Sequence, residues 1–128
     1  SKNENIKLLN LLKESDFVSS KYYSFSNIAL HGTEEYKLVN SRKCSIKETK
    51  NLENYKLFLY SHRRPFINNK KNAELLFKTD KKCFPNNYSI SVLDSIEIKN
   101  NNDIEQNNLI YNGGSNLFAY LLDVKVKR

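Results

Sequence analysis

Methionine and tryptophan are absent from this chain, and it contains only three glycines, two prolines and two cysteines. The glycines and prolines do not cluster into a linker, so no domain boundary is visible. A single pair of cysteines is far from the framework of a disulfide-dense scaffold. The apolar runs are only a few residues long, whereas a membrane-spanning helix needs about 20. These absences exclude a multi-domain arrangement with a recognisable linker and a helical membrane span.

Metal, cofactor and common catalytic motifs are also missing. Neither Cys-x-x-Cys nor His-x-x-x-His spacing occurs, and no acidic triplet suits magnesium or calcium, so no metal is expected. The chain has no glycine-rich phosphate loop, no nucleophile elbow and no zinc-protease helix. We therefore expect no cofactor and no catalytic residue.

The chain has the size and composition of one globular domain. It has 128 residues, of which 39% are hydrophobic and 27% charged, and eight Tyr and seven Phe supply large side chains for a core. We expect residues 1–128 to form a single domain. The chain begins with Ser1 and lacks Met, so we expect a processed product or an excised piece, and a missing signal peptide says nothing about its compartment.

Hydrophobic periodicity predicts one helix followed by strands. Leu8, Leu11 and Leu12 are spaced as on one face of an amphipathic helix, which we place within residues 1–16. Residues 21–128 have mainly period-two patterns. The clearest predicted strands are 88–99, 117–127 and 55–60, and the weaker ones are 21–30, 35–39, 42–47 and 107–111, while 73–78 fits helix or strand.

The predicted fold is mainly β, a small barrel or sandwich of about six to eight short, largely antiparallel strands with one N-terminal helix. An α+β fold is the alternative. Residues 100–103 and 112–114 are rich in Asn and Gly, which tolerate tight turns, so residues 88–127 are expected to form an antiparallel meander.

The net charge of +7 is concentrated in the middle of the chain. Residues 41–82 contain twelve Lys and Arg against four Asp and Glu, while both flanks are close to neutral. Such segregation is typical of a surface that contacts nucleic acid or another polyanion. Alternatively, it reflects a composition rich in Lys and Asn, with no function for the charge.

The densest basic segment is 61–72. Arg and Lys bind phosphates, and exposed aromatic rings stack on unpaired bases, so single-stranded nucleic acid (RNA or DNA) suits this mixture better than duplex. The predicted nucleic-acid-binding residues are Arg42, Lys43, Tyr60, Arg63, Arg64, Phe66, Lys70, Lys71, Lys81 and Lys82. The function expected from these residues is non-catalytic binding of a polyanion.

Cys44 and Cys83 leave a second function open. In an oxidising compartment they are expected to form a disulfide, which would bring the basic pairs 42–43 and 81–82 together; in the cytosol they would be buried free thiols. The disulfide-bonded alternative is a secreted or surface β-sandwich that binds a protein partner. The compartment stays open, with an intracellular location slightly favoured.

A third alternative is a metal-independent ribonuclease. Such an enzyme needs a general acid, a general base and a cation near the phosphate. His31, His62 and a Lys or Arg are the residues that would supply them.

Overall fold

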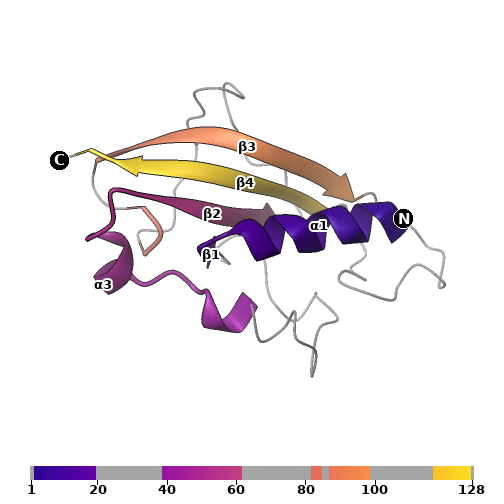
Figure 1. Ribbon diagram of the computed structural model, residues 1–128, viewed down its shortest axis with the longest axis horizontal. Coiled ribbons are helices and arrows are strands. Elements are labelled where there is room, and N and C mark those ends of the chain that lie inside the picture. Colours follow the sequence, from indigo (N-terminus) through magenta and orange to yellow (C-terminus); the bar gives the residue numbers. More distant parts are fainter. Residues whose placement is uncertain (1, 20–38, 62–81, 85–86, 99–116, 128) are drawn as a thin grey trace.

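The computed structural model describes residues 2–19, 39–61, 82–84, 87–98 and 117–127 (Figure 1). In chain order the elements are α1 (Lys2–Glu14), β1 (Phe17–Ser19), α3 (Ile46–Thr49), β2 (Asn54–Ser61), β3 (Tyr88–Ile98) and β4 (Leu117–Val126). A helical turn at residues 39–41 precedes α3. None of the described helices is long and apolar enough to cross a membrane.

The described strands form one mixed sheet in the order β1-β2-β4-β3. β1 runs parallel to β2, and β4 lies antiparallel between β2 and β3. The chain is therefore mainly β in its described part, as expected, but the barrel or sandwich of six to eight strands is wrong for these residues. Period-two alternation shows that a strand has two different faces, and it does not show whether a second sheet or a helix covers them.

Most of the weaker predicted strands fall outside the described residues, and one of them is wrong. Residues 21–30, 73–78 and 107–111 lie outside the described residues, as does 35–39 except for Val39, which is helical. The predicted strand 42–47 is wrong, because it contains a turn, one parallel bridge between Lys43 and Val18, and the start of α3. The three-residue strand β1 was not anticipated.

The predicted meander is wrong in its pairing. β3 and β4 pair directly and antiparallel, from Tyr88 opposite Val126 to Ile98 opposite Leu117. In a three-stranded meander the first and third strands would be parallel and separated by the middle strand. No intervening strand therefore separates β3 from β4.

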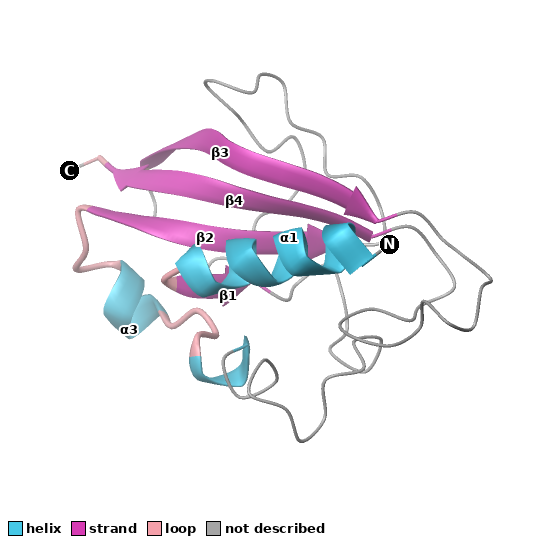
Figure 2. Ribbon diagram, turned by 45° about the vertical axis from the view of Figure 1, so that its right-hand side comes forward, coloured by secondary structure: helices cyan, strands magenta, loops and turns pink. Residues whose placement is uncertain are grey.

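α1 covers one face of the sheet, as Figure 2 shows. Leu8, Leu11 and Leu12 are buried, which confirms the predicted apolar stripe. Lys7 forms an ion pair with Asp94 of β3. Asp94 lies opposite Leu121, so the buried side chains of Leu121 and its neighbour across the sheet, Phe58, are on the side that α1 covers.

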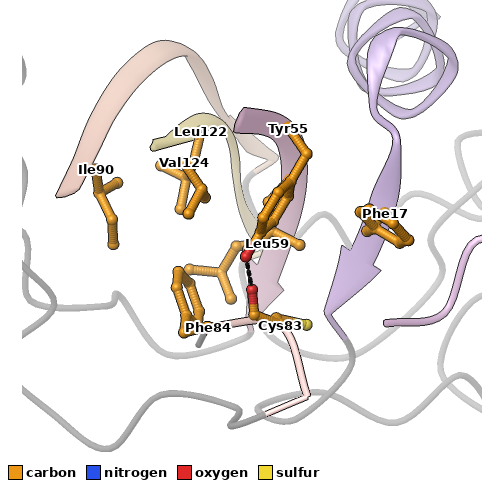
Figure 3. Close-up of a cluster of buried hydrophobic side chains, with 9 residues drawn as sticks. Phe17, Tyr55, Leu59, Cys83, Phe84, Ile90, Leu122 and Val124 are labelled. Atoms are coloured by element: carbon orange, nitrogen blue, oxygen red, sulfur yellow. Dashed lines mark hydrogen bonds between the residues drawn. The ribbon is translucent and has the colours of Figure 1, made fainter. Parts of the chain in front are cut away.

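The opposite face carries a continuous hydrophobic cluster (Figure 3). Alternate residues of β2, β3 and β4 point to this side, toward Cys83 and Phe84. In β4 the adjacent Leu121 and Leu122 are buried on opposite faces, Phe118 and Tyr120 are partly buried, and Lys125 near the end is exposed. The buried cluster consists of Phe17, Tyr55, Leu57, Leu59, Cys83, Phe84, Ile90, Leu122 and Val124.

A β-bulge between Val92 and Asp94 divides β3 into two halves. Val92 lies opposite Leu122 on the cluster side, whereas Asp94 lies opposite Leu121 on the α1 side. Side-chain direction after the bulge is therefore inverted relative to a regular strand. The bulge explains why a carboxylate occupies a position that strict alternation would place among apolar residues.

Candidate binding surface

Cys44 and Cys83 form a disulfide, with their Cα atoms 5.1 Å apart. It joins the segment before α3 to residues 82–84, beneath the hydrophobic cluster. Cys83 is fully buried and Cys44 is partly buried against the cluster. The bond is thus part of the core, and it holds Lys43 and Lys82, each next to one of the cysteines, near each other.

Thr49 fixes α3 to the same place. Its buried hydroxyl oxygen lies 3.0 Å from the carbonyl oxygens of both Ser45 and Lys82, which share its single proton. The hydrogen bond to Lys82 connects α3 to the segment that contains Cys83. α3 is therefore bound to both sides of the disulfide.

The disulfide and the Thr49 contact join three segments, and each of these segments carries exposed lysines. With Thr49 directed toward the carbonyl oxygen of Lys82, the helical spacing of 100° per residue turns Lys47 to the far side of α3 and Lys50, its C-cap, to one flank. We define the disulfide surface as Lys43, Lys47, Lys50 and Lys82, all of which are exposed. The carboxylates in the adjoining sequence are Glu48, Glu53 and Asp80, so the four lysines outnumber the acids.

Arg42, the nearest arginine in the sequence, binds the end of α1. Its Nη1 donates to the carbonyl oxygens of Leu12 and Lys13, at 2.9 Å each, and of Ser15, at 2.6 Å. The last carbonyls of a helix have no partner within it, and a cation there also interacts favourably with the helix dipole. Arg42 therefore has a structural role at α1, on the border of the disulfide surface.

Of the other predicted binding residues, only Lys43 and Lys82 have described side chains. The backbone of Tyr60 lies in β2 opposite Ala119, and its side chain is outside the described part of the structure. Arg63, Arg64, Phe66, Lys70, Lys71 and Lys81 lie outside the described residues, as do His31 and His62. The basic segment 61–72 therefore stays a prediction.

Lys47 and Lys50 are not among the site residues predicted from the sequence, because α3, which contains Lys47 and has Lys50 as its C-cap, was not predicted. A sequence signal for α3 is nevertheless present: Ser45 precedes Glu48 at the Ser-x-x-Glu spacing of a capping box. Ser45 does occupy the N-cap with an extended backbone, although its side chain makes no capping hydrogen bond. Recognising that spacing would move Lys47 from a strand to a helix and place Lys50 at the end of that helix.

Tyr55 of β2 connects the sheet to the disulfide-bonded segment 82–84. Its hydroxyl donates to the carbonyl oxygen of Cys83 (Figure 3). Its ring packs edge-on against Phe17, with centroids 5.3 Å apart. Burial raises the pKa of Tyr55, and the nearby Tyr88 raises it further, so the hydroxyl stays protonated as a donor at neutral pH.

The described residues hold no group of three His, Cys, Asp or Glu side chains that could bind a metal ion. They do include the lysines of the disulfide surface, whose backbone segments are linked by the disulfide and by Thr49. Comparison of the chain with protein-family models, with curated proteins and with solved structures finds no match.

Proposed function

We propose that this protein is a non-catalytic binding domain that holds a polyanion on the disulfide surface. The observation that carries the proposal is that the Cys44–Cys83 disulfide and the Thr49 hydrogen bond join the segment of Lys43 and α3 to the segment of Lys82, which is far away in the sequence. The disulfide and the Thr49 hydrogen bonds hold the backbone of these residues. Binding of an anionic chain to these amines therefore loses little conformational entropy of the backbone that carries them.

Charge density is the source of affinity in this proposal. A ligand with regularly spaced anionic groups releases its condensed counterions when amines replace them, which makes binding fall steeply with salt. Arg42 is not counted among the binding groups, because its guanidinium holds the α1 carbonyls. The sequence-predicted cations of 61–72 extend the binding face in this proposal toward the full basic stretch of 42–82.

The experiment is a salt titration of binding at about 50 and 200 mM salt, with a fluorescent single-stranded oligonucleotide and a sulfated polysaccharide as separate ligands. The variant is Lys47→Gln with Lys50→Gln. We expect saturable binding of at least one ligand at the lower salt. For the oligonucleotide, losing two contacts would reduce the salt slope by about 1.4.

The matched control is Lys7→Gln with Lys125→Gln. It removes the same charge away from the disulfide surface and should leave the salt slope close to that of the parent protein. A parent protein that binds neither ligand at the lower salt would overturn the proposal. Equal loss in variant and control would show that net charge, and not the disulfide surface, determines binding.

A second candidate function is binding of a protein partner outside the cell, and the disulfide is the observation that favours it. Structural disulfides persist in secreted and surface proteins and are rare in the cytosol. The described fold for this candidate is a single sheet and not a sandwich. Thiol counting on protein purified without reductant tests the compartment: two free thiols in that material would contradict it.

A further inference from the structure

The disulfide also bears on which polyanion the surface binds. Cys83 is fully buried and packs in the hydrophobic cluster, so the bond is structural and not an exposed, exchangeable one. A bond of this kind belongs to an oxidising compartment. The polyanion must then be one that a protein meets there.

The described aromatic side chains close to the disulfide are packed in the hydrophobic core. Tyr55 and Phe84 are buried, and Phe84 packs against Tyr88 with ring centroids 4.9 Å apart. Single-stranded nucleic acid gains about 1–3 kcal/mol per base by stacking on exposed rings. Among the residues that the structure describes, the disulfide surface has no exposed aromatic side chain for this.

The cations of the surface are all lysines. An ammonium group is a compact point charge with rotatable donors, whereas Arg binds phosphate and carboxylate by a planar, two-pronged geometry. Ammonium groups respond to the density of negative charge along a ligand. Sulfate esters on a sugar chain supply that density and require no stacking partner.

We infer that the ligand of the disulfide surface is a sulfated polysaccharide. The inference rests on the proposed polyanion-binding function and names its ligand class. Sulfate groups along the chain pair with Lys43, Lys47, Lys50 and Lys82, while the disulfide keeps the three segments in place.

The test compares three probes with the oxidised full chain at about 150 mM salt, near physiological ionic strength. They are heparin, the same polysaccharide after desulfation, and a single-stranded oligonucleotide of matched charge. We expect heparin to bind at least about tenfold more tightly than either of the others, a difference of about 1.4 kcal/mol. Lys47→Gln with Lys50→Gln should weaken heparin binding several-fold, and Lys7→Gln with Lys125→Gln should not.

The outcomes separate the two proposals. Tighter binding of the oligonucleotide would overturn the sulfated ligand and leave polyanion binding standing. Desulfated polysaccharide that binds as well as heparin would also overturn it, because sulfate would then contribute nothing. Failure of all three probes to bind, repeated at about 50 mM salt, would overturn the polyanion proposal as well.

Discussion

Arg42 shows how a single side chain can be diverted from the role its charge suggests. It lies in the basic middle of the sequence, yet its Nη1 contacts three carbonyl oxygens at the end of α1. The carbonyl of Leu12 also accepts from the N–H and the hydroxyl of Ser15, so the guanidinium matters most for the carbonyls of Lys13 and Ser15. The residue therefore joins α1 to the segment that leads into the disulfide.

Replacement of Arg42 should destabilise the fold. Arg42→Gln removes a charged donor from partly buried carbonyls, and we expect a loss of about 2 kcal/mol in the free energy of unfolding. Urea denaturation measures it, with Lys47→Ala as a control that should change stability by less than about 0.5 kcal/mol. Equal values for the two variants would mean that the guanidinium contacts contribute nothing.

Tyr55 makes stability depend on alkaline pH. Its ordinary pKa is about 10, and burial first, then Tyr88, raises the folded-state pKa above that value. Above about pH 10 the unfolded chain loses this proton while the folded protein keeps it, so the unfolded state is favoured. The stabilising contribution is complete below about pH 10 and is lost as pH rises toward the folded-state pKa.

The corresponding measurement is the urea midpoint between about pH 8 and 11. We expect the parent protein to lose up to about 1.4 kcal/mol per pH unit above about pH 10 through this group. Tyr55→Phe should lose less with pH while being about 1 kcal/mol less stable at neutral pH, because the Cys83 carbonyl loses its donor. Parallel pH curves for the two proteins would exclude Tyr55 as the titrating group.

Among the elements, β3 allows a direct test of its register with β4, because the bulge determines the face of the sheet on which Asp94 lies. A regular strand would place this carboxylate in the apolar cluster, where its removal would stabilise the protein. In the structure it is half exposed, pairs with Lys7 at 3.3 Å and accepts the backbone N–H of Ser95 at 2.8 Å. Asp94→Ala should therefore destabilise the protein by about 0.5–1 kcal/mol.

A double-mutant cycle with Lys7→Ala isolates the ion pair. We expect a coupling of less than about 1 kcal/mol that falls with added salt, since both side chains are about half exposed. Stabilisation by Asp94→Ala would be the sign of an unbulged strand and would contradict the register between β3 and β4.

Elements with long repeating patterns were predictable from the sequence, and short ones were not. α1, β2 and β4 show several turns or alternations of apolar residues, and burial of Leu8, Leu57 and Leu122 follows those patterns. β1 has three residues and α3 four, too few for a period to be visible. The bulge is hidden for a related reason, because one extra residue leaves the first half of β3 unchanged and only inverts the faces of the second half.

The candidate surface was predictable only as an excess of charge in the middle of the chain. Which lysines meet depends on the disulfide and on the Thr49 hydrogen bond to Lys82, and both contacts join residues far apart in the sequence. The hydrogen bonds of Arg42 to the end of α1 also join residues far apart in the sequence, so they were not predictable either. Local patterns report the charge of a segment and do not report its neighbours in the fold.

For the whole molecule, the disulfide is a covalent contribution to stability that can be removed by substitution. Closing a loop of about 40 residues stabilises the folded state by roughly 4 kcal/mol in the chain-entropy model. Cys44→Ala with Cys83→Ala should lower the free energy of unfolding by about that amount. Heparin binding by the variant, measured where it is still folded, should weaken, because Lys43 and Lys82 are no longer joined.

Reduction of the parent protein by a small thiol provides the independent comparison. It should reproduce the stability loss of the double variant and leave the double variant itself unaffected. A reduced parent as stable as the oxidised protein would show that the segments around Cys44 and Cys83 are held by packing alone.

The strand order also has a consequence for synthesis of the chain. β4 is the last of the four described strands to be made, yet it lies between β2 and β3 and connects them. Until it emerges from the ribosome, the nascent chain carries two strands whose facing edges lack their partner. Cys44 and Cys83 are both made before β4, so oxidation can join the segment that precedes β2 to the segment that precedes β3 before the strand that pairs with both is complete.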